Sequence, residues 1–286
     1  LKRPDSANPV GIANAEVVIF NTDFTFNATT DANGNYTINN MYEGNYEVIA
    51  GLWGYITSCN NEYIMPSIIN TITLEQGYYD DFTFDFGWTV SGGVTSAGDG
   101  IWERGFPEGT SDQGVNYNPD GDVSGDCTDF AYVTGLLAGG STGANDVDDF
   151  NTILTSPIFD LSANQIHYIN YSSWFQNNFP WGGAPNDSLT ISISNGSTIS
   201  VLETITSNSP DLGQWNYNSL DISQYITPTA TMQLIIETAD WDALGGHWVE
   251  GGFDNFSITN APNSIAEDSK NEISKEGEKS LEEGFT

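Results

Sequence analysis

Apolar and polar residues alternate in short runs along most of the chain, and helical spacing of apolar positions is nearly absent. The runs are rich in β-branched and aromatic residues and are bounded by Gly, Asn, Asp and Pro, which is typical of strands joined by turns. The pattern predicts an all-β protein built from sandwiches. In the first part of the chain, Asn33-Gly34 predicts a tight hairpin turn within residues 31–38. The strands expected there are residues 15–20, 24–29, 43–50 and 68–75.

Longer loops separate the apolar runs in the second part of the chain. The alternation in residues 189–194 and 232–237 suits strands with one buried face. A short helical turn is expected only at residues 222–226, before Pro228. The strands expected in this part are residues 153–156, 166–174, 188–194, 201–206, 231–239 and 253–259.

These patterns divide the chain into three segments. Residues 1–76 are expected to form a small sandwich and residues 77–260 a larger one. The junction at residues 77–88 has no Pro- or Ser-rich linker, so we expect two domains held close together. Residues 261–286 are rich in Glu, Lys and Ser and poor in apolar residues, which predicts a flexible acidic linker or tail.

Charge restricts the possible partners. The 286 residues include 39 Asp and Glu but only 6 Lys and Arg, a formal net charge of −33. Nucleic acid is excluded as an expected partner, because binding phosphate needs a basic surface. No run of 18 apolar residues is present, so we expect no membrane insertion, and a leader peptide would have to lie upstream of Leu1. The composition suits an extracellular setting, where salt screens self-repulsion.

The acidic stretch at residues 118–129 is the first candidate site. Its segment Asp120-Gly-Asp-Val-Ser-Gly repeats the first half of a calcium-binding loop, with oxygen-bearing side chains at alternate positions. The twelfth position is Ala131 rather than Glu, so the second half is missing. A second acidic cluster follows at residues 146–149. A structural Ca²⁺ ion would explain the two clusters, and the alternative is an acidic, solvated loop. The expected ligands are Asp120, Asp122, Asp126, Asp146, Asp148 and Asp149.

The two cysteines are the only candidates for a covalent cross-link. Cys59 and Cys127 are compatible with one disulfide or with two buried thiols. A disulfide would place the acidic stretch against the first domain.

No catalytic motif is present. The chain lacks His-Glu-x-x-His, Cys-x-x-Cys, Gly-x-Ser-x-Gly and a phosphate-binding loop, which predicts a protein that is not an enzyme. Glu103, Glu237 and Glu250 are nominal candidates for glycoside hydrolysis, but so many acids give them no specific support. His167 lies among aromatic residues and is expected to pack in a sheet.

Two glycine-rich loops, residues 176–187 and 240–248, combine aromatic and polar residues. Aromatic rings that stack on sugars, together with amides and carboxylates that bind hydroxyl groups, are the usual elements of a carbohydrate site. The alternative is that the loop tryptophans cover the ends of the sandwich. The candidate ligand-binding residues are Trp181, Asn186, Trp241, His247 and Trp248.

The motif Thr30-Asp-x-x-Gly-x-Tyr36, followed by Gly44-x-Tyr-x-Val48, resembles the carboxypeptidase-regulatory-like domain. This resemblance implies a small transthyretin-like sandwich, which is usually an accessory module of secreted proteins. That family opens with a Gly-x-Val strand, whereas this chain starts at Leu1. The resemblance therefore implies an incomplete first strand and further domains upstream in the same polypeptide.

The second part carries another ordered set of motifs: Trp88-Thr-Val-Ser-Gly, Trp102-Glu-Arg-Gly, residues 154–161, and Glu250-Gly-Gly-Phe-Asp-Asn-Phe-Ser-Ile258. Together they resemble a MAM-like, galactose-binding-type jelly roll. This resemblance implies a calcium ion shared by acids on the first and last strands, here Asp85 and Asp254. The pair of modules resembles the C-terminal accessory region of bacterial peptidases and adhesins exported by type IX secretion.

The sequence thus predicts a non-catalytic accessory or adhesion segment of a secreted or cell-surface bacterial protein. It would be stabilised by calcium and would bind glycans or other surface proteins. The alternatives are a fragment of a secreted metallocarboxypeptidase or glycoside hydrolase, and a structural subunit of a surface filament joined by strand addition.

Overall fold

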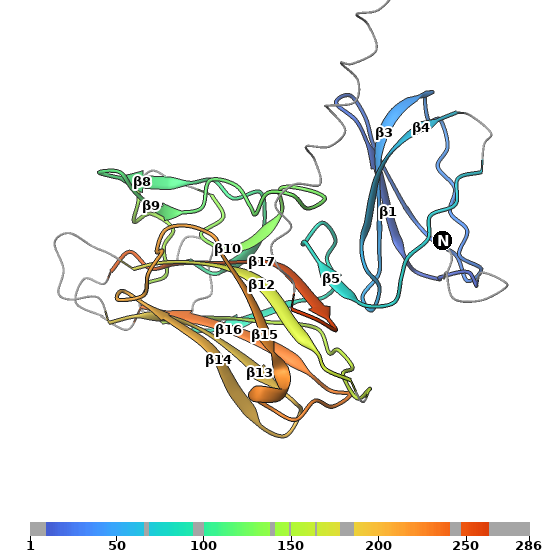
Figure 1. Ribbon diagram of the computed structural model, residues 1–286. Helices are drawn as coiled ribbons and strands as arrows, with labels where there is room; N and C mark the ends of the chain where they lie inside the picture. Colours follow the sequence, from blue (N-terminus) through green and yellow to red (C-terminus); the bar gives the residue numbers. More distant parts are fainter. Residues whose placement is uncertain are drawn as a thin grey trace, which may run out of the picture.

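The computed structural model describes residues 10–65, 69–93, 100–137, 141–148, 150–163, 165–177, 186–240 and 247–262. Within these ranges the protein is nearly all β, with strands β1 to β17 and one short 3₁₀ turn (Figure 1). The expected fold class is therefore confirmed. None of the described helical segments is long and apolar enough to cross a membrane. The tail predicted to be flexible lies, apart from residues 261 and 262, outside the described residues.

A four-stranded antiparallel sheet forms the N-terminal unit, in the order β2-β1-β3-β4. Alternate residues of β1 and β3, such as Val17, Ile19 and Val48, face a buried core. Extended segments without a place in this sheet cover that core through Ile72 and Leu74. The strands are β1 (Glu16–Phe20), β2 (Thr25–Thr29), β3 (Gly44–Gly51) and β4 (Ser58–Ile64).

Two expectations for this unit were wrong. The described part of the strand expected at residues 68–75 contributes buried side chains without entering the sheet, and the polar strand β4 occupies the edge instead. The turn at Gly34 forms, with φ of 77°, but the residues after it do not pair as a hairpin. Asp31 closes that turn by accepting hydrogen bonds from the backbone N–H groups of Asn33 and Asn35.

The larger unit is a sandwich of two sheets, stacked face to face in Figure 1. One sheet has the order β15-β12-β17-β10-β7, with β5 also paired to β17, and the other has the order β14-β13-β16-β11-β6. Strands β8 and β9 form a separate hairpin. Aromatic side chains fill the space between the layers, including Phe82, Phe159, Tyr171, Phe175, Phe253 and Phe256.

The strands of the sandwich agree with the expected positions at β11, β12, β13, β14, β16 and β17, and the turn η2 (Ile222–Gln224) lies where a helical turn was expected. The structure adds strands that the pattern did not predict. The bounds are β5 (Tyr78–Asp80), β6 (Thr89–Gly92), β7 (Trp102–Gly105), β8 (Thr110–Asp112), β9 (Val115–Asn118), β10 (Ala131–Thr134), β11 (Asn151–Thr155), β12 (Tyr168–Gln176), β13 (Ser188–Ser194), β14 (Ile199–Thr206), β15 (Asn216–Asp221), β16 (Gln233–Ala239) and β17 (Glu250–Thr259).

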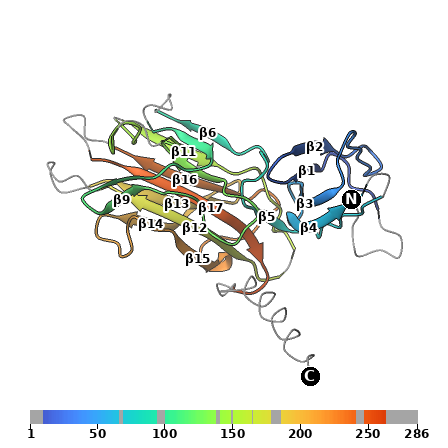
Figure 2. The ribbon, with the colours of Figure 1, turned by 90° about the horizontal axis from the view of Figure 1, so that it is seen from above.

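The two units touch through aromatic packing and one disulfide. Trp53 of the N-terminal unit stacks on Phe256 of β17, with ring centroids 5.8 Å apart and planes 13° apart. Its indole N–H donates a 2.8 Å hydrogen bond to the carbonyl oxygen of Ile158. Cys59 of β4 forms a disulfide with Cys127 of the acidic stretch. Figure 2 shows the N-terminal sheet beside the sandwich, next to β5.

Candidate functional site

A β-bulge in β17 sets the position of Asp254 in the first candidate site. The register between β12 and β17 shifts at this point, and Asn255 has a φ of 54°, in the left-handed region. A bulge inserts one residue and changes which face the following side chains occupy. Phe253 and Phe256 consequently both enter the core between the sheets, and Asp254 lies between them without being part of that core.

The acidic stretch, residues 118–129, forms a loop that covers Asp254, and we call it the acidic loop. The Asp254 carboxylate is fully buried and accepts hydrogen bonds from the backbone N–H groups of Val123, at 3.1 Å, and Asn255, at 2.7 Å. Gly121 and Gly125 turn the loop, with φ of 102° and 108°. The loop thereby brings Asp122 and Asp126 to Asp254, and one carboxylate oxygen from each of these three residues lies within 4.8 Å of the others. We call these three residues the acid triad.

The pKa values of all three acid-triad residues are raised, because the carboxylates are close together and partly or fully buried. Burial, followed by repulsion from Asp129, raises the pKa of Asp122 to about 7. Burial, with Asp122 and Asp81 nearby, raises the pKa of Asp126 to about 9. Burial, with Asp126 and Asp122 nearby, raises the pKa of Asp254 well above its ordinary value. Carboxylates held this close require either a proton or a cation between them.

The donor atoms of the acid triad fit a calcium ion. Oδ2 of Asp122 and Oδ2 of Asp126 are buried and have no hydrogen-bond partner among the described residues. A buried oxygen without a partner is costly, and a hard cation would satisfy it. All three candidate ligands are carboxylates, which Ca²⁺ prefers.

The other expected metal ligands lie elsewhere. Asp120 is exposed and accepts a 3.3 Å hydrogen bond from the N–H of Gly109. The triad therefore uses the second and third acids of the acidic stretch, Asp122 and Asp126, rather than alternate positions from Asp120, which corrects the half-loop expectation. Asp85 is exposed and accepts a hydrogen bond from the N–H of Gly87, and the carboxylates that face Asp254 are those of Asp126 and Asp122. The expectation that Asp85 and Asp254 share a calcium ion is therefore not supported by their positions in this structure.

The second acidic cluster belongs to a different part of the sandwich. Asp146 is buried, and burial with repulsion from Asp148 and Asp240 raises its pKa to about 8. Asp148 is exposed, and Asp149 lies outside the described residues. The carboxylates that act on Asp146 are those of Asp148, in its own segment, and of Asp240, which follows β16, and the acid triad is not among them.

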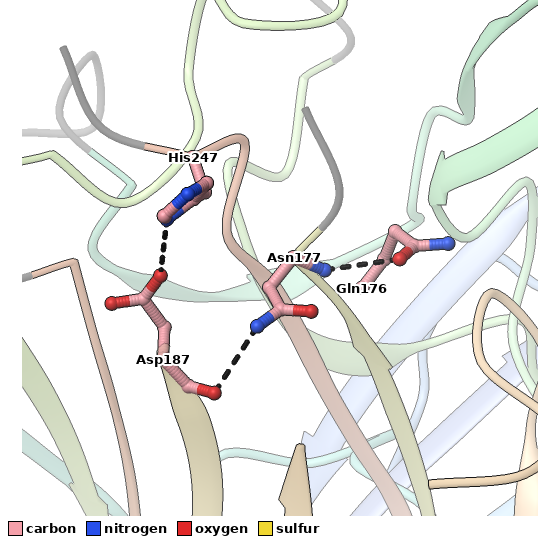
Figure 3. A network of polar contacts seen from close by, with 4 residues as sticks. All are labelled: Gln176, Asn177, Asp187 and His247. Atoms are coloured by element: carbon pink, nitrogen blue, oxygen red, sulfur yellow. Dashed lines mark hydrogen bonds and ion pairs between the residues drawn. The ribbon is translucent and has the colours of Figure 1, made fainter. Parts of the chain in front are cut away.

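Asp240 belongs to a compact group with Asp187 and His247, in which one ligand atom from each residue lies within 4.8 Å of the others. Nδ1 of His247 lies 2.9 Å from Oδ2 of Asp187 (Figure 3). The side-chain amide of Asn177 donates to the backbone carbonyl of Asp187 at 3.1 Å, and Gln176 accepts from the N–H of Asn177.

The candidate ligand-binding residues of the two glycine-rich loops are only partly described. His247 is 2% exposed, so its ring is not presented to a ligand at the surface, in contrast to the expectation. Trp248 packs edge-to-face against Tyr117, with ring centroids 5.0 Å apart. Asn186 is exposed beside Asp187. Trp181 and Trp241 lie outside the described residues.

A cleft of about 1200 Å³ lies between the N-terminal sheet and the acidic loop. Strands β1 and β2 form one wall, and the other contains Asp122 and Asp126 of the acid triad. Phe106 is 56% exposed in this cleft, with its ring centroid 4.2 Å from that of Phe130. The guanidinium of Arg104 lies 4.9 Å from the Phe130 ring centroid.

Arg104 is the basic residue that lines the cleft. It is the one Lys or Arg between residues 4 and 269, and its Nη1 donates to the carbonyl oxygens of Phe82 and Thr83. Opposite it, burial and the charge of Asp85 raise the pKa of Glu16, and Arg104 opposes that effect. Sequence reasoning missed this cleft because its walls come from both units, although the isolated cation beside an aromatic residue was a visible signal.

Comparison with known proteins identifies the N-terminal unit. Residues 5–65 match the sequence profile of the carboxypeptidase regulatory-like domain. No curated protein matches the chain.

Several solved structures are similar to the chain at low identity. TmCBM61 in complex with β-1,4-galactotriose is 11% identical, with a TM-score of 0.37, and the match covers 63% of this chain and 91% of that one. The K1 cleaved adhesin domain of Lys-gingipain from Porphyromonas gingivalis W83 is 13% identical, with a TM-score of 0.37 and coverage of 65% and 99%. The family 11 carbohydrate-binding module from Clostridium thermocellum, in complex with a mixed-linked tetrasaccharide, is 13% identical, with a TM-score of 0.34 and coverage of 65% and 95%.

Proposed function

We propose that this chain is a non-catalytic carbohydrate-binding segment of a secreted or cell-surface protein, and that the carbohydrate lies in the cleft between the two units. The exposed ring of Phe106 in that cleft carries the proposal. Phe106 is not isolated but forms an apolar surface with Phe130, and an apolar patch rimmed by polar groups is a common sign of a binding surface.

The walls of the cleft provide the contacts that a sugar needs. The C–H face of a pyranose stacks on an aromatic ring, here Phe106, which Phe130 supports from behind. Glu16, Asp85 and Asp129 line the same cleft and would accept hydrogen bonds from hydroxyl groups. The net charge of −33 would repel an anionic polymer, so the proposed ligand is neutral. The cleft is larger than a typical small-molecule pocket, which favours an oligosaccharide over a single sugar.

Calcium at the acid triad would hold one wall of this cleft in place. Asp122 and Asp126 are both triad residues and cleft-lining residues. The disulfide between Cys59 and Cys127 fixes the same loop to the N-terminal sheet. Disulfides persist in oxidising compartments, which supports the secreted location, and the acidic composition suits such a setting.

A hydrolytic role has less support. Glu237 is held by the side-chain amide of Asn151, and buried Glu250 accepts a hydrogen bond from Thr134. Neither of them, nor Glu103, lines the cleft. The carboxylates nominated for glycoside hydrolysis are therefore not placed against the proposed ligand.

A panel of immobilised neutral and anionic glycans, incubated with the intact chain in millimolar Ca²⁺, tests the proposal. The expected result is binding to one class of neutral oligosaccharide. Mass spectrometry of that oligosaccharide after prolonged incubation should show it uncleaved. Absence of binding across the panel would overturn the carbohydrate assignment, and cleavage would overturn the non-catalytic one.

A further inference from the structure

Asp187, Asp240 and His247 lie where the two layers of the sandwich end. Asp187 immediately precedes β13 and Asp240 immediately follows β16, and these strands are neighbours in the five-stranded sheet. His247 lies three residues before β17, in the six-stranded sheet. The group therefore joins side chains from both sheets at one end of the molecule.

All three residues are buried, with exposed fractions of 2% for Asp187, 1% for Asp240 and 2% for His247. Oδ1 of Asp187 is buried and has no hydrogen-bond partner within the part of the chain that the structure describes. Carboxylates are rarely buried unless they are paired or bind a metal. A single histidine, even when protonated, balances only one of the two negative charges, whereas a divalent cation with a neutral imidazole balances both.

The spacing of the donor atoms suits a cation. Nδ1 of His247 and Oδ2 of Asp187 are 2.9 Å apart, and the ligand atoms of all three residues lie within 4.8 Å. Two ligands that each lie about 2.1 Å from a tetrahedral zinc ion are about 3.4 Å apart, so this pair would separate by about half an ångström on binding. With metal bound, Nδ1 would give up the proton that it otherwise shares with Asp187, and both atoms would become ligands.

The donor set distinguishes this group from the acid triad. The triad offers only carboxylate oxygens, which calcium prefers, whereas an imidazole nitrogen favours zinc and related transition metals. We propose that Asp187, Asp240 and His247 form a second metal site, selective for Zn²⁺ or a similar transition metal, that clamps the two sheets together. This proposal is independent of carbohydrate binding.

Zinc titration of the metal-free chain, in competition with a chromogenic chelator and with excess Ca²⁺ to occupy the acid triad, tests the proposal. The expected result is one Zn²⁺ per chain at a site that Ca²⁺ does not compete for. The variant His247→Gln should bind zinc roughly tenfold more weakly or worse. The matched control His167→Gln removes the other histidine, which is also buried, and should leave zinc binding unchanged.

A measurement on the wild-type chain covers the case in which His247→Gln does not fold. The chain has only two histidines, so the ring nitrogen signals of His247 are readily assigned by NMR with the help of His167→Gln. Zinc should shift the ring nitrogen signals of His247 and leave those of His167 in place. A wild-type chain that takes up no zinc, or zinc binding that leaves the His247 signals unchanged, would overturn the proposal and leave the group as a buried His–Asp pair.

Discussion

The backbone N–H of Val123 donates a 3.1 Å hydrogen bond to the carboxylate of Asp254, although the two residues are 131 positions apart. This contact attaches the acidic loop to the last strand of the sandwich. The same loop forms one wall of the cleft and carries Cys127, which is bonded to the N-terminal unit. The position of that wall therefore depends on the bulge that places Asp254 and on the charges around it.

Calcium should stabilise the chain through the acid triad. At a free Ca²⁺ concentration 100 times the dissociation constant, the free energy of unfolding should rise by about 2.7 kcal/mol. Asp254→Asn should abolish this increase, because it removes one of three clustered carboxylates. Thermal or urea unfolding with Ca²⁺ and with a chelator measures the effect.

The matched control for that experiment is Asp23→Asn, which changes the net charge equally at an exposed position outside the acid triad. It should keep the full calcium response. An equal response in wild type and Asp254→Asn would place the calcium elsewhere.

The disulfide should contribute strongly to stability. Cys59 and Cys127 are separated by 68 positions, and closing a loop of that length stabilises by about 4 kcal/mol in the chain-entropy model. The double variant Cys59→Ser with Cys127→Ser should lose about that much in urea unfolding. A reducing agent should destabilise the wild type but leave the double variant unchanged, and an effect on both would point to another cause.

Trp53 should anchor the contact between the two units. Trp53→Ala removes the stacking on Phe256 and the hydrogen bond to Ile158, and should cost about 3 kcal/mol. Trp53→Phe retains a stacking ring but loses the hydrogen bond. The loss of that hydrogen bond should lower the free energy of unfolding by about 1 kcal/mol, in addition to a small loss from the smaller side chain. Urea unfolding compares the two, and equal costs would show that the stacking contributes nothing.

Asp80 should make stability depend on pH. It is fully buried, which raises its pKa to about 7, and hydrogen bonds from the Trp88 indole N–H and the Phe82 backbone N–H oppose that rise. A carboxyl with a raised pKa stabilises the folded chain most below its ordinary value near 4, and that contribution disappears as pH rises to 7. The stability of wild type relative to Asp80→Asn should therefore fall across pH 4 to 7, by at most about 4 kcal/mol, and be constant above.

Asp160 provides a control of opposite sign. Hydrogen bonds from the side chain and backbone of Ser162 lower its pKa. The stability of wild type relative to Asp160→Asn should be constant above pH 4 and fall as the solution is made more acidic. If both differences followed the same course with pH, the assignment of Asp80 would be wrong.

Much of the fold follows from local pattern. Strand β13 occupies residues 188–194 as the alternation of apolar and polar residues predicts, because one of its faces is buried. Strands β4 and β15 were missed because Asn and other polar residues dominate them, and their place in a sheet is decided by pairing with β3 and β12. Such pairing depends on residues that are distant in the sequence, so the pattern within one segment does not predict it.

The candidate sites were predictable only in part. The clustering of acids along residues 118–129 drew attention to Asp122 and Asp126, and Asp254 was expected from a resemblance. Their meeting depends on the bulge at Asn255, which no local pattern signals. The group of Asp187, Asp240 and His247 combines residues of three loops, of which only His247 was singled out in advance, for a different reason.

The most direct test of the account compares carbohydrate binding by the wild type, Phe106→Ala and Phe24→Ala, using calorimetry with the oligosaccharide selected from the glycan panel. Phe24 is another exposed phenylalanine, 41% accessible, that does not line the cleft. Phe106→Ala should weaken binding by about tenfold or more, because the stacking ring is lost, while Phe24→Ala should bind like the wild type. Undiminished binding by Phe106→Ala would contradict the assignment of the cleft as the carbohydrate site.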